Sequence, residues 1–216
     1  MQGLKILINR SLQKISCGIY GLLSITFGII GDSVAYLLYP GYDFRRRAVS
    51  SLCLGPGGLF FQMGTIISGL FALLFVIHLE KTFNEEIVSK NLKKYVKIAA
   101  IISCVSFTML GIFCGSNPII AYIHGINAVI SWIFGVTYIT IFNILFLKSP
   151  RYSKFLAYFG FFATFTLSLL MFIFFLHLFP SLRFLMRILP SLEWLNTLML
   201  ILWYFVVSSY IIQKKI

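Results

Sequence analysis

Charged residues are scarce in this chain of 216 residues, and so are signs of a soluble fold. Asp, Glu, Lys and Arg together make up 11% of the sequence, whereas soluble domains usually carry about 25%. Hydrophobic residues reach 59%, and the mean hydropathy is +0.94. These values exclude a water-soluble globular protein. A transmembrane β-barrel is disfavoured as well, because the apolar residues come in continuous blocks of about 20 and do not alternate with polar ones.

Signatures of the common catalytic sites are also absent. The sequence has no GxSxG elbow, P-loop, CxxC pair or HExxH motif, and it lacks the motif set of membrane lipid phosphatases. Its histidines, His78, His124 and His177, are single residues without the spacing of metal ligands. We therefore expect no metal site and no cofactor, and the residues alone do not define a reaction.

Acidic residues are the rarest charged group, with six Asp and Glu against 18 Lys and Arg and a formal net charge of +12. In a soluble protein this balance would suggest nucleic acid. Here the basic residues lie at the ends of apolar blocks, which is typical of membrane topology and of contact with anionic lipid headgroups. No basic stripe with interleaved aromatic residues lies outside those blocks, so we expect membrane lipids and not nucleic acid as partners.

The apolar blocks predict an all-α bundle of six transmembrane helices in a single domain, residues 1–216, because about 20 apolar residues cross a ~30 Å hydrocarbon core. The basic tail leads into a block that is too long for a signal peptide and has no small-residue cleavage site, so we expect an uncleaved first span. The predicted spans cover approximately residues 16–38, 57–79, 96–115, 119–147, 155–179 and 192–212.

The distribution of basic residues predicts a multi-pass protein of the cell membrane with both termini in the cytoplasm. Of the 18 Lys and Arg, 13 fall on the side of the termini and five on the other side. The outer five are Arg45, Arg46 and Arg47 in the first connection, and Arg183 and Arg187 in the fifth, which resembles a short interfacial helix. We interpret them as lipid- or anion-binding residues, although the first three could instead pair with a carboxylate.

Polar side chains inside the apolar blocks should face the bundle interior, because they are costly in contact with lipid. We take Asp32, near the outer end of the first span, as the only acid within a span. In the fourth span, His124, Asn127, Ser131 and Tyr138 lie at relative positions 0, 3, 7 and 14, on one helical face. We expect this face to point inward.

The roles of Asp32 and His124 stay open. Asp32 either reaches interfacial water or pairs with an arginine of the first outer connection, or it carries a proton or binds a ligand. His124 either packs through hydrogen bonds or acts as a base or a ligand. Because both residues fall at the same depth, we expect one outward-facing polar chamber roofed by residues 39–56.

The four cysteines lie at different depths. Cys17 and Cys104 are expected to be buried thiols. Cys53 lies in the first outer connection and Cys114 at the outer end of the third span, where both would face an oxidising exterior. We predict a Cys53–Cys114 disulfide that ties the first connection over the bundle; the alternative is two free thiols in packed surroundings.

Two stretches resemble the six-span prokaryotic membrane family called domain of unknown function 998. They are YPGYDFRRRAVSSLCLGPGGLFFQMGTIISGL, residues 39–70, and GIFCGSNPIIAYIHGINAVISWIFG, residues 111–135. Cys53 stands where the family motif usually has an acid and Cys114 replaces a proline, which adds to the disulfide prediction. A more distant similarity to eukaryotic autophagy modulators and GPI-anchor remodelling factors implies lipid handling. The matching residues are Ser51, Leu54, Gly55, Phe60, Phe61, Gly69, Gly111, Phe113, His124 and Ala128.

Three functions fit these features. The first is a lipid-binding protein or a subunit beside other membrane proteins, in which the outer arginines bind phosphate and His124, Asn127 and Ser131 line a pocket. The second is a lipid-modifying enzyme at the outer leaflet that uses Asp32 and His124 as acid and base. The third is a small transporter with the same pair as a proton relay. We favour the first, because catalytic groups are scarce and the loops are short.

Overall fold

The computed structural model describes residues 16–83 and 89–216, and within these ranges it contains helices and no strands. Six helices are long and apolar enough to cross a membrane, as the sequence predicts. The basic tail with Lys5, Arg10 and Lys14, which entered the orientation prediction, lies outside the described residues. The six helices are α2 (Cys17–Leu37), α3 (Gly58–Lys81), α4 (Lys90–Ile112), α5 (Pro118–Lys148), α6 (Lys154–Phe175) and α7 (Leu189–Lys214). The shorter 3-10 helices are η1 (Val49–Leu54), η2 (Leu176–Leu178) and η3 (Pro180–Ile188).

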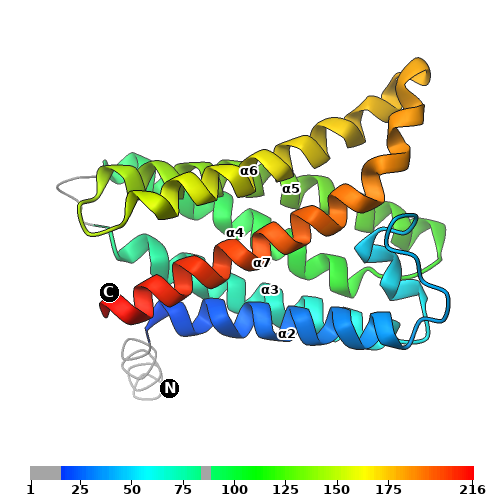
Figure 1. Ribbon diagram of the computed structural model, residues 1–216, viewed down its shortest axis with the longest axis horizontal. Coiled ribbons are helices and arrows are strands. Elements are labelled where there is room, and N and C mark those ends of the chain that lie inside the picture. Colours follow the sequence, from blue (N-terminus) through cyan, green and yellow to red (C-terminus); the bar gives the residue numbers. More distant parts are fainter. Residues whose placement is uncertain (1–15, 84–88) are drawn as a thin grey trace.

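The six long helices form a ring in sequence order (Figure 1). Each packs on its neighbours in the chain, and α7 packs on both α6 and α2, which closes the ring. The start of α2 and the end of α7 lie at the same end, which we call the terminal end. η1 and the α4–α5 connection lie at the other end, which we call the disulfide end because it contains Cys53 and Cys114.

The helix bounds follow the predicted spans closely except at α4, which begins at Lys90 and not near residue 96. The hydroxyl of Ser89 caps this helix by accepting from the backbone N–H of Leu92 at 3.3 Å. The lysines of its first turns lower the local hydropathy, yet their long side chains can extend from a helix end to the interface. The apolar block therefore marks the membrane-embedded part of α4 and not its start.

Glycines set how closely α2 approaches its neighbours. Gly31 of α2 faces Gly64 of α3, and a methyl group on either would lie 2.7 Å from the other's Cα. At the terminal end, a methyl on Gly18 of α2 would lie 2.5 Å from the carbonyl oxygen of Ser208 in α7. Residues without a side chain allow this backbone contact between membrane helices. From there α7 runs diagonally away from α2 toward η3 (Figure 1).

Large aromatic side chains fill the terminal half of the ring. Phe75, Phe142, Phe146 and Trp203 have no measurable exposure. Asn143 is equally buried, and its amide joins three helices because it accepts from the Trp203 indole at 3.4 Å and donates to the Thr164 hydroxyl of α6 at 3.4 Å. Beyond this packed core, internal space remains toward the disulfide end.

Candidate functional site

A cavity of about 170 Å³ lies inside the ring, between the aromatic core and the disulfide end. All six long helices contribute to its walls, and η1 contributes Val49 and Ser50. Much of the lining is apolar, but polar groups occur at two levels. The two levels differ in how fully their hydrogen-bonding capacity is used.

At the level nearer the core, the polar side chains form hydrogen bonds across helix pairs, to other side chains or to a backbone carbonyl. Such bonds between transmembrane helices are a packing device, because they satisfy polar groups that would otherwise meet hydrocarbon. The three contacts are Ser24 Oγ to Ser68 Oγ at 3.2 Å, Ser103 Oγ to the Ser131 carbonyl at 2.9 Å, and Tyr138 to Tyr204 through their hydroxyl oxygens at 3.1 Å.

At the level nearer the disulfide end, hydrogen-bond acceptors are left over. Asp32 of α2 forms no hydrogen bond or ion pair with the described part of the chain. Asn196 of α7 is 4% exposed, and its Oδ1 atom has no partner. Glu193, one turn earlier on α7, accepts from the backbone N–H of Ser50 at 3.0 Å. Asp32 and Glu193 are close enough to interact electrostatically.

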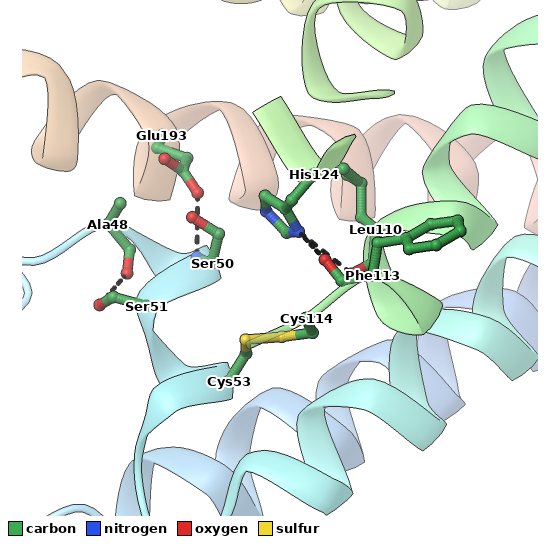
Figure 2. The surroundings of a disulfide bond; sticks show 9 residues. All are labelled: Ala48, Ser50, Ser51, Cys53, Leu110, Phe113, Cys114, His124 and Glu193. Carbon is green, nitrogen blue, oxygen red and sulfur yellow. Dashed lines mark hydrogen bonds between the residues drawn. A yellow bond between two sulfur atoms is a disulfide. The ribbon is translucent and has the colours of Figure 1, made fainter. Parts of the chain in front are cut away.

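His124 stands on the opposite wall with a defined orientation (Figure 2). Its Nδ1 atom lies 2.9 Å from the Phe113 carbonyl and 3.2 Å from the Leu110 carbonyl, at the end of α4. Because carbonyl oxygens only accept, Nδ1 carries a proton. The other ring nitrogen points away from α4, to the side where Glu193 and Ser50 lie. His124 and Glu193 also interact electrostatically.

A covalent bond holds the roof of the cavity in place. The predicted Cys53–Cys114 disulfide is confirmed, with Cα atoms 6.0 Å apart, and it joins η1 to the end of α4 (Figure 2). Val49 and Leu52 of η1 are buried in a small second core against Phe61 of α3. The bond and this core together keep Ser50 over the cavity.

Aromatic residues fix the remainder of the α2–α3 connection. The Tyr42 hydroxyl donates to the Ala48 carbonyl at 2.6 Å, and the Trp194 indole of α7 donates to the Arg47 carbonyl at 3.2 Å. Burial raises the pKa of the Tyr42 phenol, so it stays protonated and keeps donating. The connection is therefore joined to α7 as well as to α4.

A groove of about 740 Å³ lies on the side of the ring, between α2 and α7. Its walls are mainly apolar and include Ile29, Tyr36 and Leu198. Asp32 lines both this groove and the central cavity, as do Thr197 and Ile201 of α7. The two spaces thus share a wall that contains a carboxyl group.

The predicted arginine run lies outside the cavity. Arg45, Arg46 and Arg47 are exposed on the α2–α3 connection, and none lines the cavity. Arg46 pairs with Asp43 at 3.6 Å, and the Arg47 guanidinium lies 5.0 Å from the centre of the Tyr39 ring. The ion pair considered between this run and Asp32 does not form, because nearer aromatic and acidic groups engage the guanidinium groups.

The other predicted residues are divided between the cavity and its surroundings. Arg183 and Arg187 are exposed on η3, the short helix that the sequence indicated. Ser131 lines the cavity with His124. Asn127 does not, because its amide donates to the Ile123 carbonyl of its own helix at 2.9 Å. In the described residues, no group of three His, Cys, Asp or Glu side chains is placed to hold a metal ion.

Two residues of α7 were missed at the sequence level. The statement that Asp32 is the only acid within a span is wrong, because Glu193 is the second residue of the predicted range 192–212. Asn196 follows it after three residues, so the two side chains lie on one helical face. The same periodicity that revealed the stripe on α5 would have found this pair.

Comparison of the chain with known proteins finds no matching family model, curated protein or solved structure.

Proposed function

We propose that this protein binds a membrane lipid or a similar amphiphile, with the polar headgroup in the central cavity and the apolar chain in the groove between α2 and α7. The proposal rests on the observation that Asp32 lines both the cavity and the groove. A molecule that bridges them would place its polar part beside a carboxyl group and its apolar part against Ile29 and Leu198.

The volumes of the cavity and the groove support placing the headgroup in the first and the apolar chain in the second. Sites for whole small molecules usually measure about 300–1,000 Å³. The groove, at about 740 Å³, lies in this range, whereas the cavity, at about 170 Å³, admits only a small polar group. A compact headgroup joined to a hydrocarbon chain matches both volumes.

We place the disulfide end at the outer face of the cell membrane. The distribution of basic residues supports this orientation, and a disulfide suits an oxidising compartment. In intact cells, an impermeant maleimide should label Ser181→Cys at the disulfide end. It should label Lys215→Cys at the terminal end only after permeabilisation. The reverse pattern would overturn the orientation.

The binding proposal is tested by native mass spectrometry of gently extracted protein. Ser33 lines the groove, and Ile30 of the same helix faces the lipid outside it. Wild type should retain bound lipid, and Ser33→Trp should lose it because the indole fills the groove. Ile30→Trp is the matched control and should retain it. Lipid-free wild type that also fails to take up added lipid would refute the proposal.

A lipid-modifying enzyme is the second candidate, and the orientation of His124 favours it. With Nδ1 donating to backbone carbonyls, the free nitrogen of the neutral ring is an acceptor that could serve as a base. Proteoliposomes of wild type and His124→Gln would be compared by lipid mass spectrometry, with Asn127→Ala as the control. A product formed by wild type and Asn127→Ala but not by His124→Gln would support this function. Unchanged lipids with wild type would exclude it for the lipids supplied.

A further inference from the structure

We infer that the headgroup recognised in the cavity bears a primary ammonium group. This inference rests on the proposed lipid binding and names its ligand class. It begins from the charges of the lining, which include the carboxyl groups of Asp32 and Glu193 and no Lys or Arg. The basic side chains that would bind a phosphate lie elsewhere, on the outer surface of the α2–α3 connection and on η3.

The cavity lining offers unpaired hydrogen-bond acceptors, so a matching ligand should supply hydrogen-bond donors. Asn196 provides the independent observation, because its side chain is 4% exposed and its Oδ1 has no partner. A buried acceptor without a partner is unfavourable because it has lost its hydrogen bonds to water, so a ligand that donates to it is favoured. Asp32 has no hydrogen-bond or ion-pair partner in the described part of the chain, and Glu193, bonded to Ser50, adds a second carboxyl group. An ammonium group has three N–H donors and could supply both Asn196 and Asp32.

The same arrangement argues against other headgroups. A headgroup that ends in a free phosphate or in phosphoglycerol offers the two carboxyl groups no cation and brings only negative charge toward them, whereas a terminal ammonium group supplies the opposite charge. A quaternary ammonium has the required charge but no N–H, and it would leave Asn196 Oδ1 without a partner. The three methyl groups would also add volume to a cavity of about 170 Å³. Recognition should therefore separate a primary amine from both alternatives.

The test compares phosphatidylethanolamine, phosphatidylcholine and phosphatidylglycerol with identical acyl chains, added to delipidated full-length protein and measured by native mass spectrometry. Wild type should bind phosphatidylethanolamine at least about tenfold more tightly than the other two, since a hydrogen bond to a charged group contributes roughly 1.5–3 kcal/mol. Asp32→Asn and Glu193→Gln should each remove most of this preference. Gln at position 193 can still accept from the Ser50 N–H, which preserves the roof.

Asp43→Asn is the matched control, because Asp43 is a carboxylate on the α2–α3 connection that does not line the cavity. It should keep the wild-type preference. Free ethanolamine forms a separate arm, and competition at millimolar concentration would support recognition of the ammonium group itself. Absence of competition together with equal binding of the three lipids would overturn the ammonium site.

Failure of the inference and failure of the proposed function give different results. Equal binding of the three lipids would overturn the ammonium site and leave lipid binding intact. Preference for phosphatidylglycerol would overturn it as well and would point to the exposed arginines. Absence of binding to all three lipids and to ethanolamine would overturn both proposals.

Discussion

Removal of the Cys53–Cys114 disulfide should destabilise the protein by about 3–4 kcal/mol. The bond closes a loop of 61 residues, for which the chain-entropy relation gives about 4 kcal/mol. The loop contains α3 and α4, with 24 and 23 residues. Because transmembrane helices satisfy their own backbone groups, they persist in detergent-denatured states. The flexible part then approaches ~15 residues, for which the same relation gives about 3 kcal/mol.

Equilibrium unfolding in mixed micelles with increasing dodecyl sulfate measures this difference. Reduced wild type and the Cys53→Ala/Cys114→Ala variant should both unfold earlier than oxidised wild type, and a reductant should not change the variant further. Cys17→Ala/Cys104→Ala is the control for the buried free thiols and should respond to a reductant as wild type does. Coincident unfolding curves for oxidised and reduced wild type would refute the reasoning.

Three further predictions concern packing and pH. Asn143→Ala should lower the free energy of unfolding by about 1–3 kcal/mol because it leaves the Trp203 indole without an acceptor, whereas Asn127→Ala should stay within about 0.5 kcal/mol in the same unfolding assay. Gly64→Val should lower the midpoint of thermal unfolding, because the new side chain would push α2 away from α3. Gly125→Ala should not lower it, because a Cβ added at Gly125 meets no atom within 4 Å. Burial raises the pKa of the Tyr152 phenol to about 12, from about 10 in an unfolded chain. The phenol's contribution to the free energy of unfolding is complete below the lower pKa and is lost as the pH rises toward the higher one. In an alkaline titration, the free energy of unfolding of Tyr152→Phe should therefore fall less steeply with pH in this window than that of wild type.

Much of the architecture could be predicted from the sequence because each span must satisfy its own backbone and be apolar over a fixed length. Both constraints apply to each span by itself, so a span can be recognised from its own residues. The disulfide could be predicted for a related reason: topology alone placed Cys53 and Cys114 at one face. Hydropathy was less informative at α4, where Lys90 belongs to the helix and not to the apolar block.

The site could be predicted only in part, because helical periodicity shows which residues share a face and not what that face meets. The stripe on α5 brought Ser131 to the cavity, yet Asn127 bonds to its own backbone. An ion pair with the arginines of the first connection was one of the alternatives for Asp32, and the folded connection holds those arginines elsewhere. Its actual neighbour, Glu193, lies 161 positions away in the chain, and only the closure of the ring by α7 brings the two together.

That closure also determines where the ring can open. Five of its six interfaces join consecutive helices, whereas α2 and α7 meet with no connecting segment between them. The backbone contact of Gly18 with Ser208 at the terminal end can act as a pivot, and α7 diverges from α2 beyond it. A scissor-like swing about this pivot would widen the passage to Asp32, and it would have to break the bonds that Trp194 and Glu193 of α7 make with the α2–α3 connection. For the lipid binding proposed above, such a swing would provide a lateral entrance from the membrane that does not open toward water.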